Sequence, residues 1–341
     1  MQRSASLPQS ASLFAVSTLC AALLAACGGG GSDAASSSSA ASIDDATATT
    51  YAANATQIGS DTMDVADSAV LGAQALIAAG VGVSSSDDRV TAMGVDTKPL
   101  VASTRPCAGG GSATVSITGG TPESQVNGKL DTGEVYQVSF AACAGAAGFA
   151  TLDGTLGMTV ESATGDSANG ALSLSLTATN LSLTLPQGGA MLNGSTERQY
   201  SVSTDTDGTV HLSSHFTSPS LTLATHYNAR ASSFTLSNAD IVRTATLVGG
   251  VLQSSTISGS HTLTATLPNA SFSYTVATTG GATYAADGTP TGGQWTITLP
   301  QTIVGVTIAG GMATITIDRG KDGTVDRTII VPLPQLVSMA G

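Results

Sequence analysis

The chain has few aromatic residues and few basic ones. Of its 341 residues, 6 are Phe, 6 are Tyr and 1 is Trp, and Lys and Arg together number 11 against 23 Asp and Glu. So few aromatic side chains give little material for stacking on sugars or bases, or for the aromatic girdles of a membrane-spanning barrel. The excess of acid repels phosphate backbones, so we expect no nucleic-acid partner.

Catalytic signatures are also missing. The sequence has no Gly-x-Ser-x-Gly elbow and no Walker-type or dinucleotide-binding loop. It has only four glutamates, so paired-carboxylate catalysis would depend on scattered aspartates. We therefore do not expect an enzyme. The alternative is a hydrolase whose site is assembled from residues far apart in the sequence.

The longest apolar run lies at the N-terminus. Residues 11–26 are uncharged and follow a short segment whose one charged side chain is Arg3. The run is shorter than the roughly 20 residues of a membrane-spanning helix and contains Ser and Thr, which is typical of a signal peptide. A Gly/Ser-rich stretch follows Cys27, and this composition predicts a flexible tether, which we assign to residues 27–59.

The sequence Leu24-Ala25-Ala26-Cys27 resembles the lipobox of Gram-negative bacterial lipoproteins. The resemblance implies that residues 1–26 are removed and that Cys27 carries the lipid anchor. In these lipoproteins an aspartate after the cysteine implies retention in the inner membrane. Here that position is Gly28, which implies the outer membrane, facing the periplasm or the cell surface. An ordinary secretory signal cleaved nearby is the alternative.

The mature chain would be strongly acidic and would keep two cysteines. Removing Arg3 with the leader leaves 10 basic and 23 acidic residues, a net charge of −13. Cys107 and Cys143 form an even pair in an oxidising compartment, which predicts a disulfide. A metal site is the alternative, but two cysteines without a nearby histidine fall short of four ligands.

One helix is expected, over residues 61–79. An apolar stripe recurs there at steps of three and four residues, at Met63, Ala66, Val70, Ala73 and Ile77. Gly80 ends it, and we expect the stripe to pack on a sheet. Residues 87–105 are expected to form a linker, so residues 60–106 make up a helix and linker.

From residue 112 the apolar pattern changes to a period of two, and we assign residues 107–341 to a β-rich domain. Leu172, Leu174 and Leu176 alternate with polar residues, and Leu181 continues the pattern with opposite parity, which predicts a bulge or tight turn near Asn180. The sequence predicts a mainly β fold, a long antiparallel meander of about fifteen short strands with one N-terminal helix. The meander would form a curled sheet, a partial barrel or a sandwich.

Three Gly-containing turn signals have a common form. They are Leu152-Asp153-Gly154, Leu192-Asn193-Gly194 and Ile257-Ser258-Gly259, and each is followed by another alternating run. We interpret them as hairpin turns. Their unequal spacing excludes a solenoid repeat.

A further resemblance covers the region around the two cysteines. The run GKLDTGEVYQVSFAAC, followed by LDGTLGMTV, resembles uncharacterised β-rich lipoproteins of Gram-negative bacteria. That group has no assigned activity, so the resemblance implies a fold and a location only.

Two patterns have the spacing of metal sites. Asp318, Asp322 and Asp326 surround Gly323 as acidic residues do in calcium loops, but basic residues lie among them and a glycine stands at the third position. We favour a hairpin turn without a cofactor and keep calcium as the alternative. His211 and His215 have the outer spacing of a zinc-protease motif, but residues four apart on a strand are about 13 Å apart. We interpret both as solvent-facing.

These features predict a non-enzymatic module at the outer membrane, attached to the membrane by its lipid anchor. It would bind an apolar ligand or a protein partner, or have a structural role. An aliphatic sheet face with few aromatic residues suits acyl chains better than sugars. The alternative is a component of a surface or export assembly, in which edge strands pair with another chain.

The lipid anchor can be tested directly. Because acylation needs the thiol of Cys27, Cys27→Ser should abolish labelling by a fatty-acid probe and release the protein into the soluble periplasmic fraction. Labelling and fractionation of both proteins check this. Equal membrane association with no label on the wild type would contradict the anchor.

Overall fold

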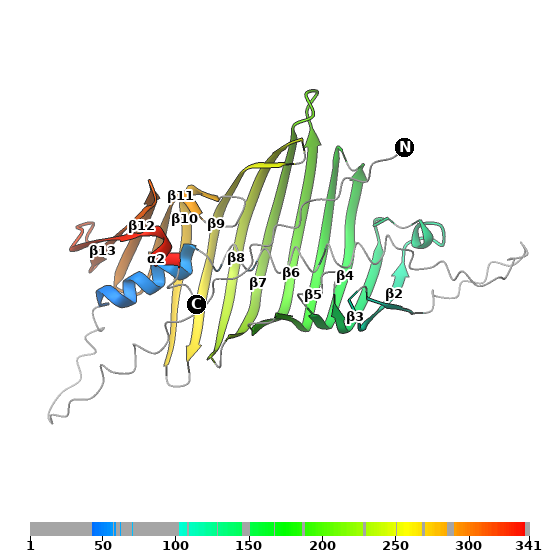
Figure 1. Cartoon of the computed structure of the whole chain (residues 1–341), viewed down its shortest axis with the longest axis horizontal. Helices are drawn as coiled ribbons and strands as arrows, with labels where there is room; N and C mark the ends of the chain where they lie inside the picture. The colour runs from blue at the N-terminus through cyan, green and yellow to red at the C-terminus, as the bar shows by residue number, and fades with distance from the viewer. Residues whose placement is uncertain are drawn as a thin grey trace, which may run out of the picture.

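A computed structural model of the chain is shown in Figure 1. It describes residues 43–56, 58, 62, 70, 102–107, 109–127, 129–144, 151–166, 168–185, 188–227, 230–249, 251–267, 270–284 and 290–337. The predicted leader and Cys27 lie outside the described residues.

The protein is an antiparallel meander of fourteen strands in one sheet, in which each strand pairs with the next in sequence. The strands are β1 (Ser103–Pro106), β2 (Ser112–Gly119), β3 (Glu134–Ala144), β4 (Thr151–Gly165), β5 (Gly170–Leu185), β6 (Gly188–Thr204), β7 (Val210–Tyr227), β8 (Arg230–Val248), β9 (Val251–Leu267), β10 (Ala270–Tyr284), β11 (Pro290–Thr298), β12 (Thr302–Ala309), β13 (Met312–Arg319) and β14 (Arg327–Pro332). A 3-10 turn, η1 (Ser124–Val126), lies between β2 and β3, and a short helix, α2 (Leu333–Val337), follows β14. The predicted fold class is confirmed, and the sheet is open, with β1 and β14 at its edges.

The central strands are much longer than expected. β7 and β8 contain 18 and 19 residues, and β7 joins two runs that the sequence pattern separates near Ser218. The expectation of short strands is wrong, because several glycines that we interpreted as turns lie inside strands.

Gly154, Gly194 and Gly259, which we call the bulge glycines, lie inside β4, β6 and β9, so the three predicted hairpin turns are wrong. Each lies on the strand next to a β-bulge, whose extra residue is Ala142 in β3, Asn180 in β5 and Asn238 in β8. Their φ angles are 98°, 130° and 127°, and the strand register shifts beside them. A Cβ on Gly259 would lie 2.0 Å from the backbone oxygen of Asp240. Glycine is therefore required both by the positive φ and by the close approach of the neighbouring strand.

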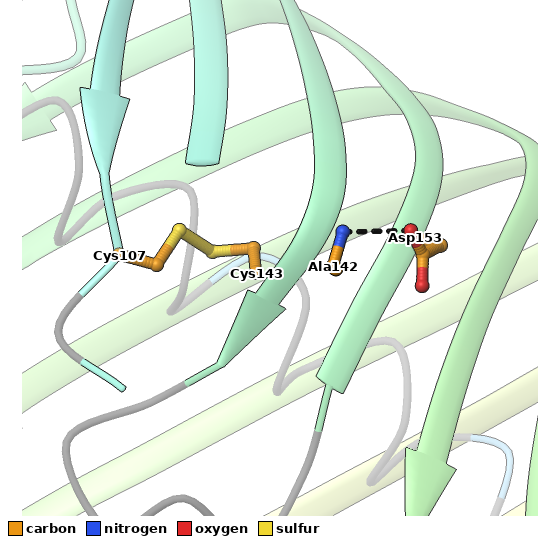
Figure 2. Close-up of a disulfide and its surroundings, with 4 residues drawn as sticks. All are labelled: Cys107, Ala142, Cys143 and Asp153. Carbon is orange, nitrogen blue, oxygen red and sulfur yellow. Dashed lines mark hydrogen bonds between the residues drawn. A yellow bond between two sulfur atoms is a disulfide. The ribbon is translucent and has the colours of Figure 1, made fainter. Parts of the chain in front are cut away.

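The residue before each of two bulge glycines also serves the adjacent strand. Asp153 Oδ1 accepts a hydrogen bond of 2.7 Å from the backbone N–H of Ala142, whose φ is 46° (Figure 2). Asn193 Oδ1 accepts one of 2.6 Å from the N–H of Asn180, whose φ is 47°. The Asx side chain thus satisfies the N–H of a left-handed residue that a regular ladder would leave unpaired. The bulge predicted near Asn180 is confirmed.

Each bulge keeps the same face of a long strand buried. Leu174 and Leu176 are buried before the bulge in β5, and Leu181 is buried after it with opposite parity. We call the face that carries these side chains the buried face and the opposite one the solvent face.

A helix lies where the tether was expected. Residues 45–56 are helical, which corrects the assignment of residues 27–59 to a tether. Asp44 caps the helix, because its Oδ1 accepts a hydrogen bond of 2.7 Å from the N–H of Thr47, and hydrogen bonding to Thr47 lowers the pKa of the Asp44 carboxyl. The tether is inferred from the Gly/Ser-rich stretch after Cys27, whereas residues 45–56 are rich in alanine, which has a high helix propensity and a small side chain that packs closely.

This helix belongs to the interior. All of residues 51–56 are buried. The ring of Tyr51 lies 4.6 Å from that of Tyr274 and 5.4 Å from that of Phe272, both on β10, and the Tyr284 hydroxyl donates a hydrogen bond of 3.0 Å to the Thr56 carbonyl. The helix therefore covers the buried face of the sheet at β10 (Figure 1).

Ionic contacts extend the attachment of this helix to the last strands. Arg327 at the start of β14 forms an ion pair with Asp45, in which Nη2 lies 2.9 Å from Oδ2. Arg319 at the end of β13 donates a hydrogen bond of 3.2 Å to the Ile43 carbonyl. The N-terminal end of the helix is thus joined to the C-terminal end of the sheet.

The expected boundaries around residues 60–106 are only partly described. Of the predicted helix at residues 61–79, Thr62 and Val70 are described, and both are helical and buried. The predicted linker ends early, because β1 begins at Ser103. Pro106 is the last residue of this edge strand, where a missing N–H is tolerated. No helix in the described part of the chain is long and apolar enough to cross a membrane.

Cys107 and Cys143 form the predicted disulfide, with their Cα atoms 5.3 Å apart (Figure 2). The bond joins the residue after β1 to the end of β3. It thereby secures the first edge of the sheet, where β1 has only four residues.

The bulge glycines yield a stability prediction. Gly259→Ala should lower the free energy of unfolding by about 2 kcal/mol or more, because its Cβ would overlap the Asp240 carbonyl and strain a positive φ. Gly208→Ala is the matched control, because Gly208 also has a positive φ, 84°, but no atom within 4 Å of the added Cβ. Urea unfolding of both variants measures the difference, and equal losses would contradict the bulge geometry.

Candidate functional site

The buried face of the central strands is mainly aliphatic but carries polar side chains at its middle. One row across the sheet runs from Leu174 on β5 through Arg198 on β6 and Phe216 on β7 to Ile241 on β8, each directly paired with the next. All four side chains are buried, and Arg198 and Phe216 are both 0% exposed. A guanidinium thus lies within an otherwise apolar row.

Aromatic rings surround this guanidinium. The Arg198 Cζ atom lies 5.0 Å from the ring centre of Phe216 and 5.6 Å from that of Tyr200. Cation–π attraction of this kind is stronger away from water, so it offsets part of the cost of burying the charge.

The next row towards the β6–β7 turn contains three polar residues that pair directly across the strands. Tyr200 pairs with Ser214, and Ser214 pairs with Arg243. The Ser214 Oγ is buried and has no hydrogen-bond partner among the described residues. A buried hydroxyl in this state costs about 1–3 kcal/mol, so it is a group with unused binding capacity.

The row on the other side of Arg198 is polar as well. Thr196 and Ser218 are buried, and the Ser218 hydroxyl donates a hydrogen bond of 2.7 Å to the Ser195 carbonyl. His261 on β9 is 5% exposed and its Nε2 atom lacks a partner in the described part of the chain. Burial lowers the pKa of His261 to about 4, so its ring is neutral at neutral pH.

We refer to these polar side chains of β6–β9 as the inner polar cluster: Thr196, Arg198, Ser214, Ser218, Arg243 and His261. Aliphatic side chains of the same face surround them, including Leu174, Leu176, Leu221, Leu236, Ile241, Ile257 and Leu263. The arrangement combines a broad apolar surface with a small number of hydrogen-bonding groups, which is the composition of many sites for small apolar ligands.

A second buried polar group lies at β3. Glu134 is fully buried, and its Oε2 accepts hydrogen bonds of 2.8 Å from the Asp131 N–H and 2.6 Å from the Tyr136 hydroxyl. Burial raises the pKa of Tyr136, and the bond to Glu134 raises it further. These contacts come from the adjoining loop and strand, so we assign Glu134 to holding the β2–β3 connection in place.

The calcium-loop candidate lies in the turn between β13 and β14. Asp318 accepts hydrogen bonds from the backbone N–H groups of Asp322 and Gly323, at 3.2 and 3.0 Å, and Asp326 accepts one of 2.6 Å from the N–H of Arg319. The carboxylates therefore serve the turn itself, as the hairpin interpretation expects. The described residues include no group of three or more His, Cys, Asp or Glu side chains that could hold a metal ion.

The two histidines with zinc-protease spacing do not converge. His211 Nε2 lies 2.9 Å from Asp205 Oδ2, and His215 Nε2 lies 2.8 Å from Asp240 Oδ1. Each therefore has its own carboxylate partner on the solvent face, in keeping with the solvent-facing interpretation. The side chain of His226 lies outside the described residues, whereas His261 is buried.

The comparisons with known proteins give no functional lead. No family model matches the chain, and no significant match is found among curated proteins or among solved structures.

The buried histidine predicts a pH dependence of stability. Between pH 6.5 and about 4, the unfolded chain binds a proton at His261 that the folded chain does not. The contribution of neutral His261 to the free energy of unfolding is therefore fully present above pH 6.5. It decreases as the pH falls towards 4, by about 3 kcal/mol at most. His261→Leu should flatten this part of the curve.

The measurement is urea unfolding at a series of pH values for the wild type, His261→Leu and the control Ser213→Ala, which changes no titratable group. Only the His261 variant should change the slope between pH 6.5 and 4. An identical slope in all three proteins would contradict a buried neutral His261.

Proposed function

We propose that the chain is an exported, lipid-anchored β module at the outer membrane that binds an amphipathic ligand with a long apolar part, without enzymatic activity. The observation that carries the proposal is the buried face of the open sheet, aliphatic over many strands and interrupted by the inner polar cluster. The resemblance of Leu24–Cys27 to a lipobox supports the location.

The chemistry of the buried face favours acyl chains over sugars. Its lining is dominated by Leu, Ile and Val, whose flexible packing suits hydrocarbon, and aromatic platforms are few. A polar head group would lie against the inner polar cluster, where Ser214 Oγ and His261 Nε2 have hydrogen-bonding capacity to offer. A fatty acid has both parts.

The open sheet supports a route to this face. Because β1 and β14 are not paired with each other, the sheet does not close around this face. In a closed barrel, access from the side would require a backbone hydrogen-bond ladder to break, and the open sheet has no such ladder between its two edges.

The proposal predicts dye binding. Purified Cys27→Ser protein should enhance the fluorescence of an anilinonaphthalene sulfonate dye, and a long-chain fatty acid should displace it. Ser214→Ala should lower the affinity for the fatty acid by about tenfold, which is the equivalent of one hydrogen bond to a charged group. The fold should survive, because this substitution removes an unsatisfied buried hydroxyl.

Ser213→Ala is the control, because Ser213 lies next to Ser214 in sequence but on the solvent face. It should leave the affinity unchanged. A folded protein that binds neither dye nor fatty acid would contradict ligand binding and leave a partner-binding or structural role.

A further inference from the structure

The hairpin between β8 and β9 ends in exposed apolar side chains. Val248 and Val251 face each other across the turn and are 50% and 59% exposed. Leu212 on the neighbouring β7 is 39% exposed. We call residues Leu247, Val248, Val251 and Leu252 the apolar tip.

The apolar tip is apolar on both faces. Leu247 pairs with Leu252 and with Val210 of β7. Since successive side chains of a strand point to opposite faces, Leu247 and Leu252 lie on the face opposite to Val248 and Val251. The tip therefore has no polar face that could be exposed to water in place of its apolar side chains.

The tip also extends past the described ladder between β9 and β10. The described residues of β10 pair with β9 only as far as Ser255, through Tyr284, so Val251 to Ser254 extend beyond that ladder by about 10 Å. This length matches the depth to which amphipathic elements enter the boundary between head groups and acyl chains. The Val248–Val251 pair closes the end of the hairpin.

Charge separates this hairpin from its neighbour. Residues 244–260 contain no Asp, Glu, Lys, Arg or His. The β6–β7 turn at the same end of the sheet carries exposed Asp205 and Asp207. The β8–β9 hairpin therefore places no charged side chain next to the exposed valines at its tip.

We infer that the apolar tip inserts into the surface of a zwitterionic phospholipid bilayer. Apolar side chains on both faces of a projecting hairpin are buried fully by a fluid phase, whereas the face of a folded partner would cover one side only. The net acidity of the chain and the nearby aspartates favour a bilayer without net negative charge. This contact is independent of the acyl anchor and of the ligand proposed for the buried face.

The test uses full-length exported protein carrying Cys27→Ser, so that no acyl chain contributes, and phosphatidylcholine vesicles. The protein should co-sediment with the vesicles. The double variant Val248→Asp/Val251→Asp should reduce the partition coefficient by roughly tenfold or more, because aspartate is strongly disfavoured in hydrocarbon. A bimane label at Val248→Cys should be quenched by brominated lipid.

The matched control is Val325→Asp/Ile330→Asp, which adds the same charge at two other exposed apolar residues, 52% and 62% exposed, at the β13–β14 turn and on β14. It should bind vesicles like the parent protein, and both variants should keep the parent melting temperature. The inference is overturned if the parent protein does not bind vesicles, if both variants lose binding equally, or if the tip variant instead dissociates a dimer in sedimentation velocity.

Discussion

The left-handed bulges are the constraint on which the rest of the structure depends. A strand of 15 to 19 residues alternates its side chains without interruption, and bulges add bend and twist to it. At Asn180 in β5 and at Asn238 in β8 the extra residue shifts the parity, so the aliphatic side chains on either side of the bulge still face inward. Without these shifts, half of each such strand would turn its leucines to water. The continuous buried face, the burial of the helix and the inner polar cluster all follow from this correction.

The interior also joins the two ends of the chain. The helix at residues 45–56 lies within the segment that the sequence assigns to a tether, yet its contacts are with β10, β13 and β14. Tyr51 and the buried alanines occupy space that a sandwich would fill with a second sheet. The sheet therefore buries this part of its face against a segment from the opposite end of the sequence.

The sequence predicts the meander, the disulfide, the solvent-facing His211 and the bulge near Asn180, because each depends on a local pattern of alternation or on cysteine pairing. It does not distinguish a turn from a bulge. Asp153-Gly154 and Asn193-Gly194 have the composition of type I′ turns, yet they lie inside strands, where Asp153 and Asn193 accept the N–H of a bulge residue in the neighbouring strand. The inner polar cluster escapes prediction for the same reason. Whether Arg198 and Ser214 face inward depends on how many bulges precede them.

The meander has a consequence for how the chain folds. Since every ladder joins strands adjacent in sequence, each new strand closes a short loop and costs little chain entropy, which is the condition for rapid folding of a β protein. The disulfide lies within the first three strands, between residues separated by 36 positions. It can form as soon as the first three strands have paired, before most of the sheet exists. The sheet can then grow strand by strand from a covalently closed first edge, in the order in which the chain emerges.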